Sequence, residues 1–432
     1  NALNRAIYLL EEIGAGKAVH GVAECYPVPE KPVEIKAAPT KLAARIGCDI
    51  DAATMKAILE NLDFTVEEKG EDSWVVTVPT WRKDCDCSAD LSEEVARMYG
   101  YDKIESKTPE LIMARGGQAP IEDVKDMIRD TLTGIGLDEV MTYSFYNAQV
   151  FDNLGLPADD SRRKALQIIN PISDDFRTIR TTLTPCLLST VAYNQARQSE
   201  RTAIFEVGRV FIPKTLPLTD FPEEKMVLAI AMSGKRNPLS WNTAKDAIDF
   251  YDIKGALEEV MDSLQVKGLS YGPTKEVFLH PGKSCAISYE GKVIGFMGAI
   301  HPTVQDRFGL SAETYVLEVE IAPFVKSAEQ IPQFEHVPQF PSVSRDIAVV
   351  VKAGVSASDL EAEIRKEGGA LLVDVRIFDV YTGKQVKSGY KSVAFNLTFQ
   401  DVSRTLQDKD VDDVIKQIVA NVQDKFGGML RD

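Results

Sequence analysis

WRKDCDCSADLSEEVARMYGYDKI, residues 81–104, is the stretch from which the rest of this sequence is most readily interpreted. Its second half predicts a helix, because Leu91, Val95 and Met98 recur on one apolar stripe. Gly100 follows the last apolar position, where a glycine commonly ends a helix. The polar residues at the start of this helix are therefore the first candidates for a functional site.

Four carboxylates gather around the start of the predicted helix, which Ser88 is suited to cap. Asp90, Glu93 and Glu94 are spaced three and four positions apart and share one helix face, and Asp84 precedes them in a loop that can fold back. Crowded carboxylates need a counter-charge, and Mg²⁺ suits carboxylates that leave it several waters. An acidic first turn that the helix dipole stabilises without metal is the alternative. The spacing alone leaves both interpretations open.

The same stretch resembles the end of a small domain in the β subunit of bacterial phenylalanyl-tRNA synthetases. That family carries a PSWRxD…DLxEEVARxYGYdxI signature there. The matching positions are Trp81, Arg82, Asp84, Asp90, Leu91, Glu93, Glu94, Arg97, Tyr99, Gly100 and Tyr101. In the family the four acidic positions bind Mg²⁺. The resemblance therefore implies a magnesium site at Asp84, Asp90, Glu93 and Glu94.

Bulk properties narrow the class of protein. A chain of 432 residues is long enough for two to four domains. No apolar run approaches the roughly 18 residues that a membrane span needs, so we expect no membrane contact. The six cysteines form no CxxC motif, which favours reduced thiols in a cytoplasmic protein. A net charge of −16 argues against nonspecific nucleic-acid binding, although one segment of such a chain can still contact RNA.

The first part of the sequence predicts a tail and a small domain. Residues 1–34 begin inside an amphipathic helix pattern and end in a proline-rich linker, so we interpret them as the tail of a preceding domain. Residues 35–110 predict two helices, a two-stranded ribbon at 64–67 and 73–78, and the acidic helix. This order suggests a winged-helix-like shape. Its acidic third helix would repel phosphates, which disfavours DNA reading.

Residues 121–325 are expected to form a central domain. A strand at 139–145 follows its first helix, and the runs NPISDDFRTIRTTLTPCLLSTVAYNQAR and AIFEVGRVF come later. These runs resemble the β subunit's version of a class II synthetase core, with its dimerising motif 1 helix and its motif 2 strand. The first helix has one apolar face, which in the family belongs to the region that joins the subunits: Ile121, Val124, Ile128, Leu132 and Ile135. We therefore expect an exposed apolar patch on this domain when the chain stands alone.

The central domain is not expected to catalyse adenylation. Active class II enzymes hold ATP phosphates with one motif 2 arginine and one motif 3 arginine. Glu206 and Arg209 resemble part of motif 2, but the domain ends in YVLEVEIAPF, which contains no arginine and no glycine-rich turn. The resemblance thus implies that ATP is bound by a partner α subunit. For Arg209 a role as a salt-bridged scaffold residue is the preferred interpretation.

Residues 338–432 predict a ferredoxin-like βαββαβ domain. Strands are expected at 346–351, 373–381, 392–399 and near Met429, and helices at 356–366 and 410–426. The runs FPSVSRD, FDVYTG, KSVAFNLTFQD and RTLQDKDV resemble the ferredoxin-fold anticodon-binding domain that closes the same β subunit.

Alternation along the strands of this domain indicates a free sheet face with Arg376 and Phe378 on it. An arginine and an aromatic ring on an open sheet suit the stacking of RNA bases, with Arg345 and Arg404 as supporting phosphate contacts. An ordinary half-solvated sheet is the alternative. The segment holds 13 basic and 14 acidic residues, so nearly all of the net negative charge lies elsewhere in the chain.

The sequence therefore predicts an α+β multidomain chain with a winged-helix-like domain, a catalytically degenerate class II synthetase-like antiparallel sheet and a C-terminal ferredoxin-like domain. The implied function is that of a non-catalytic β subunit, which supports ATP-dependent attachment of phenylalanine to tRNA(Phe) by an α subunit. The implied assembly holds two α and two β subunits, with Mg²⁺ as a cofactor. A free-standing RNA- or DNA-binding regulator built from the same domains is the alternative.

Overall fold

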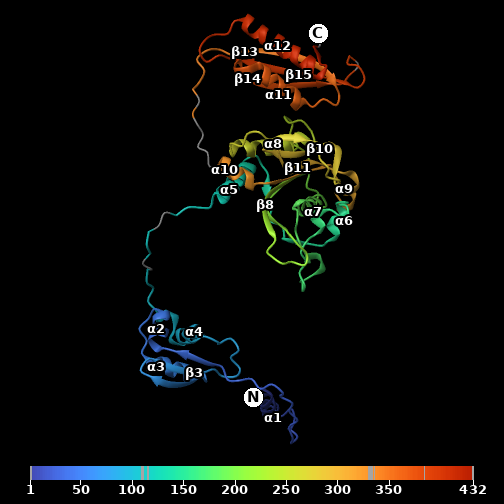
Figure 1. Ribbon diagram of the computed structural model, residues 1–432. Helices are drawn as coiled ribbons and strands as arrows, with labels where there is room; N and C mark the ends of the chain where they lie inside the picture. Colours follow the sequence, from blue (N-terminus) through green and yellow to red (C-terminus); the bar gives the residue numbers. More distant parts are fainter. Residues whose placement is uncertain are drawn as a thin grey trace. The chain divides into compact units, whose positions relative to one another are not determined.

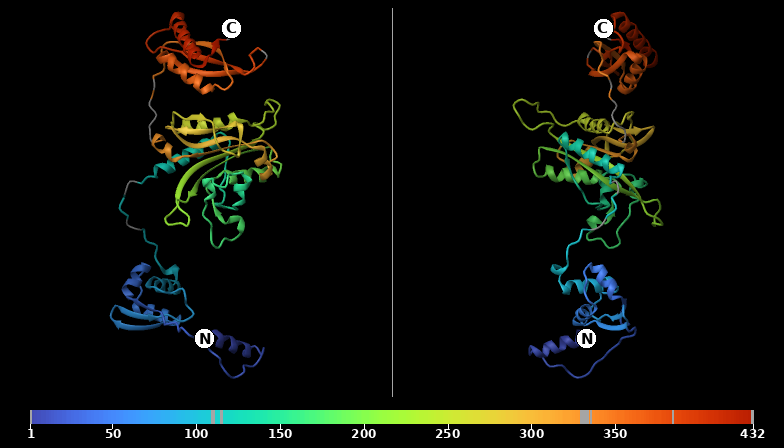
Figure 2. Two further views of the ribbon diagram at one scale, coloured as in Figure 1. Left: turned by 45° about the vertical axis from the view of Figure 1, so that its right-hand side comes forward. Right: turned by 90° about the vertical axis from the view of Figure 1, so that its left-hand side faces the viewer.

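The computed structural model describes residues 2–108, 111–113, 116–328, 334, 336–383 and 385–430. The chain divides into two compact units, residues 1–116 and 117–432. Figures 1 and 2 show the helices and strands of each unit. Among the described residues, we find no helix with both the length and the hydropathy that crossing a bilayer requires.

The first unit contains a three-stranded antiparallel sheet in the order β1-β3-β2. Its elements are α1 (Ala2–Glu12), β1 (Glu34–Ala37), α2 (Pro39–Ile46), α3 (Ala52–Asn61), β2 (Thr65–Gly70), β3 (Ser73–Thr77), α4 (Ser88–Tyr99) and the 3-10 turn η1 (Tyr101–Lys103). Buried residues of α2, α3, α4 and the sheet, among them Leu42, Leu59, Trp74 and Leu91, form one core. This shared core joins α2, α3, the sheet and the acidic helix α4 into one body.

Two sequence predictions for this unit are wrong in detail. The ribbon of two strands is a sheet of three, because β1 pairs with β3 and places Ile35 opposite Val76. Four residues after a proline-rich linker are too few to show a strand pattern. The N-cap of α4 is Cys87 rather than Ser88, and the Asp90 side chain accepts the backbone N–H of Cys87 in a capping box.

The second unit begins with a central domain built on a seven-stranded sheet. The strand order is β4-β7-β8-β12-β11-β10-β9, and every pair is antiparallel except β4 with β7. The strands are β4 (Asp138–Glu139), β7 (Arg201–Ile212), β8 (Glu223–Gly234), β9 (Ser270–Gly272), β10 (Leu279–Tyr289), β11 (Lys292–Ile300) and β12 (Thr314–Glu320). A separate pair joins β5 (Phe145–Tyr146) to β6 (Thr178–Ile179).

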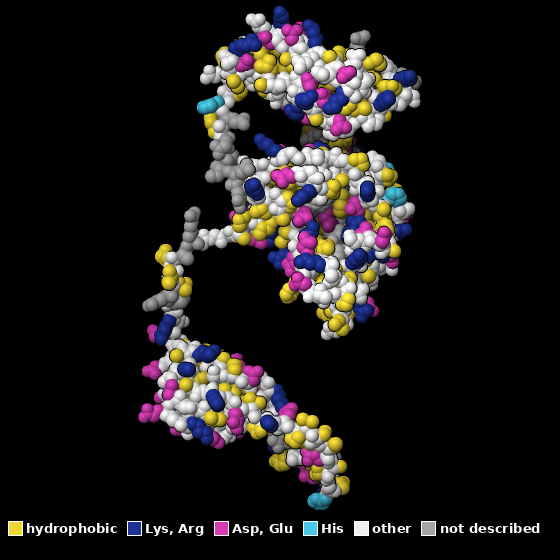
Figure 3. All heavy atoms as spheres, in the orientation of Figure 1, with side chains coloured by type: hydrophobic (Ala, Val, Ile, Leu, Met, Phe, Trp, Pro, Cys, Tyr) yellow, Lys and Arg dark blue, Asp and Glu magenta, His cyan; other side chains and the backbone are white. Residues whose placement is uncertain are grey.

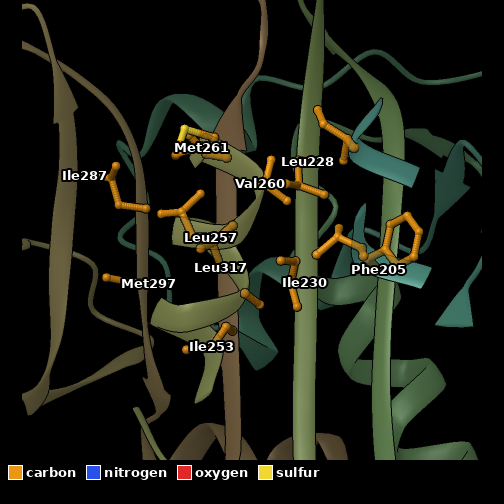
Figure 4. Packing of buried hydrophobic residues seen from close by; sticks show 14 of the residues in the cluster. Phe205, Leu228, Ile230, Ile253, Leu257, Val260, Met261, Ile287, Met297 and Leu317 are labelled. Atoms are coloured by element: carbon orange, nitrogen blue, oxygen red, sulfur yellow. The ribbon is translucent and has the colours of Figure 1, made fainter. Parts of the chain in front are cut away.

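Helices cover both faces of this sheet. The helices of this domain are α5 (Pro120–Gly134), α6 (Gln149–Asn153), η2 (Ser161–Arg163), η3 (Asp174–Phe176), α7 (Thr184–Gln195), α8 (Phe250–Ser263), α9 (Pro302–Phe308), η4 (Ala322–Phe324) and α10 (Val325–Ala328). Alternate residues of β8 belong to two different cores: Leu228 and Ile230 pack with α5 and α8, whereas Ala229 and Ala231 pack with α7 and α9. Figure 4 shows Leu257 and Val260 of α8 in the first of these cores.

Two predictions about the start of this domain need correction. The expected strand at 139–145 is replaced by two short strands. β4 pairs with β7 in the large sheet, and β5 pairs with β6 in a separate two-stranded sheet. The first helix buries Val124, Ile128 and Leu132 in the core of its own domain, so this face is not the exposed apolar patch that we expected from it. Ile135 is 43% exposed, since the helix ends at Gly134 and Ile135 lies beyond its last turn.

The last domain has the predicted βαββαβ order. Its elements are β13 (Val343–Lys352), α11 (Ala357–Gly368), η5 (Gly369–Leu371), β14 (Leu372–Tyr381), β15 (Tyr390–Phe399), α12 (Asp408–Phe426) and β16 (Met429–Leu430). The antiparallel strand order β14-β15-β13-β16 is that of a ferredoxin-like sheet, and both helices pack into its single core. The opposite face of the sheet carries Asn396 and Asp346, whose side chains are hydrogen-bonded to each other.

A buried carboxylate of β12 fixes the N-terminus of α7. One oxygen of Glu318, Oε2, accepts hydrogen bonds from the hydroxyls of Thr182 and Thr184 and from the backbone N–H groups of Leu183 and Thr184, at 2.7–3.0 Å. Burial raises the pKa of Glu318, and the four donors oppose that shift. Glu318 thus supplies from a strand the acceptor that the first turn of α7 lacks locally.

Replacing this acceptor should destabilise the second unit. We expect Glu318→Ala to lower the free energy of unfolding by about 1–3 kcal/mol, because it leaves buried donors without a hydrogen-bond acceptor. Urea denaturation of the full chain measures this loss. Glu320→Ala is the matched control, since Glu320 lies on the same strand and pairs with Lys225 at the surface. Equal stability of the two variants would contradict the assignment.

Candidate functional site

Arg82 is the centre of the predicted metal region. Its guanidinium donates from Nε and Nη2 to the two oxygens of Asp84, at 3.0 and 2.7 Å. It also donates from Nη1 and Nη2 to the two oxygens of Glu94, at 3.0 and 2.9 Å. Arg97 adds a contact of 2.7 Å to Glu94. Asp84 and Glu94 are thus brought together, with an arginine between them.

The other two predicted ligands lie apart from this pair. Asp90 accepts the backbone N–H groups of Asp86 and Cys87 through Oδ2, both at 2.9 Å. Glu93 is exposed and lines a groove of about 490 Å³ between α2 and α4, together with Arg45. Glu93 and Glu94 are consecutive residues of α4, so their side chains point in different directions. Glu94 is buried in the domain, whereas Glu93 is exposed.

The donor set therefore does not fit one shared ion in this arrangement. Within the described residues, the cluster whose ligand atoms all lie within 4.8 Å of one another is Asp86, Cys87 and Asp90 rather than the predicted four. Asp90 in that cluster already caps α4. Magnesium binding at Asp84, Asp90, Glu93 and Glu94 stays a prediction, and no chemical step is derived from it. The sequence showed Arg82 as part of a motif without indicating that it pairs with two of the acids.

A second buried ion pair lies under β7, the strand that the sequence predicted to correspond to motif 2. Arg180 Nη1 donates to Glu206 Oε1 at 2.7 Å, and both side chains are only 5% exposed. Arg180 also donates from Nε to the carbonyl of Arg209, and Thr142 donates its hydroxyl to the second oxygen of Glu206 at 2.6 Å. Arg209 itself is exposed and pairs with Glu224 at 3.1 Å. This arrangement agrees with the scaffold interpretation of Arg209, while Arg180 was not foreseen.

An apolar groove of about 430 Å³ borders the same region. Its lining includes Met141, Tyr143, Phe176 and Cys186. Met141 is 94% exposed, and the rings of Tyr143 and Phe176 meet edge to face at 5.0 Å. Figure 3 shows that apolar side chains lie exposed among charged ones on the central domain. An exposed methionine and aromatic residues beside a groove are features of protein–protein contacts.

The predicted RNA residues of the last domain form two separate pairs. Arg376 and Phe378 lie on β14, where Phe378 is 57% exposed. Arg376 is opposite Asn396, whose amide donates to Asp346 at 2.6 Å, and it lies 3.6 Å from Asp374. Phe378 occupies a bulge between Ile377 and Asp379, two residues that pair with consecutive residues of β15.

The bulge changes the alternation that the sequence suggested. Arg376 and Phe378 keep the exposed positions predicted for them. Beyond Phe378 the alternation shifts by one residue, so that Asp379 takes the place expected for Val380 and lies opposite Ala394. Bulges depend on the pairing strand, and the residues of β14 alone do not reveal one.

Arg345 of β13 and Arg404, in the loop before α12, both pair with aspartates at the start of α12. Arg345 donates to Asp408 and Arg404 to Asp410, both at 2.7 Å. Arg345 and Ile347 are two residues apart on one strand, so their side chains lie on the same face of the sheet. Ile347 is buried under the helices, and Arg345 therefore also lies on the helix-covered side. Any phosphate contact by these arginines therefore competes with an aspartate.

Comparison with known families accounts for this set of domains. Residues 104–321 match the family described as "Phenylalanyl tRNA synthetase beta chain CLM domain". The chain belongs to this family. Residues 35–101 match the "tRNA synthetase B5 domain", and residues 338–431 the "Ferredoxin-fold anticodon binding domain". The three matches follow one another along the chain in the order that the sequence motifs suggested.

Curated relatives of this synthetase β-chain family cover the full length of the chain. Proteins named "Phenylalanine--tRNA ligase beta subunit" from Clostridium acetobutylicum and Moorella thermoacetica are 34% and 36% identical over 431 residues. The protein of that name from Vibrio parahaemolyticus is 38% identical over 440 residues. The alignments cover all of this chain and 53–54% of each relative, so the chain spans about half their length.

A solved structure of pyrrolysyl-tRNA synthetase from Desulfitobacterium hafniense is also similar to part of the chain. The match covers 48% of this chain and 68% of that protein at 12% identity and a TM-score of 0.38. A score at this level adds nothing to the assignment, which rests on the family matches.

The Arg82–Glu94 pair predicts an acid-sensitive first unit. Hydrogen bonds from Arg82 lower the pKa of Glu94 from 4.5 to about 2. A lowered pKa stabilises the folded state above pH 4.5, and that contribution is lost as the pH falls toward 2. Acid unfolding followed by fluorescence of the buried Trp74 should therefore show a shallower pH dependence in Glu94→Gln.

Glu93→Gln is the control for this experiment, since it removes an exposed carboxylate from the adjacent position of α4. It should leave the unfolding profile close to that of the parent chain. Superimposable profiles for the parent and Glu94→Gln between pH 4.5 and 2 would contradict the role of the pair.

Proposed function

We propose that this chain is the non-catalytic part of a phenylalanine–tRNA ligase β subunit, which supports ATP-dependent attachment of phenylalanine to tRNA(Phe) by an α subunit. The succession of three synthetase-associated domains over residues 35–431 carries the proposal. The curated relatives described above are all named as subunits of that ligase, and none of these names favours a free-standing regulator.

The proposed role assigns the chemistry to the α subunit. In the central domain, which we interpret as a degenerate class II fold, buried charge is already paired internally between Arg180 and Glu206. Arg209, the motif 2-like arginine, points to the surface and pairs with Glu224. A phosphate clamp needs arginines that are free to face the nucleotide. ATP and its magnesium therefore belong to the partner in this proposal.

The apolar groove on the central domain is the surface that we assign to the partner. Met141 and Tyr143 stand exposed at its edge, and the extended segment that carries them joins β4, an edge strand of the large sheet, to β5. The name "beta subunit" of the relatives implies another kind of subunit. An assembly of two α and two β subunits in the cytoplasm is the complete form of the proposal.

The open sheet of the last domain is the surface that we assign to tRNA. Phe378 presents a half-exposed ring, and it lines a pocket together with Ala357 and Glu361 of α11. Arg376 is a cation that is 77% exposed and lies opposite Asn396. Stacking on such a ring does not require a basic surface, so the nearby Asp374 and Asp346 do not prevent it. Arg345 and Arg404 would contribute phosphate contacts only by leaving their aspartates.

Reconstitution with the partner tests the proposal as a whole. The full chain should not attach phenylalanine to tRNA by itself, and co-expression with the α subunit of the same organism should give a co-purifying, active complex. Tyr143→Asp should reduce co-purification, because it places a charge in the apolar groove. Val293→Asp, at an exposed position on β11, is the control. Failure of an α subunit to bind the chain would contradict the proposal.

Truncating the stacking ring tests the RNA surface separately. We expect Phe378→Ala to weaken tRNA(Phe) binding by the assembled enzyme roughly tenfold to a hundredfold, the equivalent of one stacked base. Arg376→Ala should also reduce the salt dependence of binding by about one phosphate contact. Filter-binding titrations at several salt concentrations measure both effects. Val402→Ala, which trims an exposed apolar side chain of the same domain, should bind like the parent; unchanged affinity in Phe378→Ala would contradict the assignment.

A further inference from the structure

Arg82 contacts two carboxylates of the small domain, those of Asp84 and Glu94. Both oxygens of Asp84 and both of Glu94 accept from its guanidinium, and Oε2 of Glu94 also accepts from Arg97. The guanidinium plane lies over the ring of Phe64, with 5.7 Å between the guanidinium carbon and the ring centroid. Two-pronged contacts of this kind are the strongest that a carboxylate makes with a side chain.

A divalent cation at the same place would compete with this arrangement. Mg²⁺ requires oxygen ligands at about 2.0–2.1 Å in octahedral geometry. It would have to remove Arg82 from Asp84 and Glu94, and then remain next to two guanidinium groups. The charges of Arg82 and Arg97 already balance those of the two acids. An added cation would place two further positive charges beside Glu94, whose side chain is only 8% exposed and already pairs with both arginines.

We propose that Arg82 is the permanent counter-ion of Asp84 and Glu94, and that the loop before α4 is held on the helix without a divalent cation. The arginine is a positioning residue: it joins the 82–85 loop to the buried side of α4 and covers the ring of Phe64. This assignment disagrees with the magnesium site that the family resemblance implies. It does not depend on the proposed function.

Hydrogen exchange of the full chain tests the proposal directly. Peptides from α4 and the preceding loop should exchange at the same rate in millimolar Mg²⁺ and in excess EDTA, because Arg82 supplies the counter-charge in both solutions. Exchange that accelerates severalfold in EDTA would overturn the proposal. So would a saturable magnesium-binding isotherm of the chain that Asp84→Asn abolishes.

Replacement of the arginine gives the second part of the test. Arg82→Met keeps the apolar stem and removes the guanidinium, so α4 should exchange about tenfold to a hundredfold faster. Lys83→Met is the matched control, because Lys83 is the exposed neighbour that pairs with Glu30; it should leave α4 unchanged. Equal protection in Arg82→Met and Lys83→Met would overturn the proposal.

Two further variants distinguish lost pairing from general misfolding. Arg82→Met combined with Glu94→Gln should recover part of the protection, because no buried charge is left without a partner. Arg82→Lys keeps the charge but not the fork of donors, so its protection should lie between those of the parent and Arg82→Met. In Arg82→Met alone, Mg²⁺ should slow exchange by occupying the freed carboxylates. An identical response to Mg²⁺ in the parent chain would contradict the proposal.

Discussion

Buried carboxylates in this protein are satisfied by donors from the chain itself, and much of the structure depends on that constraint. A carboxylate removed from water is costly unless donors surround it. Arg82 fulfils this requirement for Glu94, Arg180 for Glu206, and the start of α7 for Glu318. Each pairing joins segments distant in sequence, so the same contacts that satisfy charge also fix loops and helices on their sheets.

This constraint also determines where function can lie. The large sheet is covered by helices on both faces, and the polar groups under β7 have internal partners. The two surfaces that we propose for binding lie on the outside: the apolar groove near Tyr143 and the sheet that carries Phe378. Such a distribution suits a subunit that contacts other macromolecules, and it fits the synthetase β-chain family to which the chain belongs.

The sequence predicted most reliably those elements whose pattern is local. The helix periodicity of Val124, Ile128 and Leu132 and the alternation along β15 both correspond to the structure, because burial of one face imposes a regular period. Motifs of several residues in order led to the family. These signals do not depend on knowing which segments meet in space.

The features that the sequence did not predict arise from contacts between segments. The pairing of β1 with β3, the bulge at Phe378 and the position of Arg345 beside Asp408 all require a partner strand or helix to be known. The acidic cluster shows the same effect. The spacing of the acidic residues predicted that Glu93 and Glu94 share one helix face with Asp90. In the structure only Glu94 is buried, and it forms an ion pair with Arg82.

Titration of the full chain with ATP and Mg²⁺ by calorimetry tests most directly the proposal that the buried carboxylates of this chain are satisfied internally and that ATP is bound by a partner subunit. We expect no saturable heat of ATP binding in the absence of the α subunit. Saturable binding of ATP that Glu206→Gln or Arg180→Met abolishes would instead show that the pair under β7 belongs to a nucleotide site of this chain.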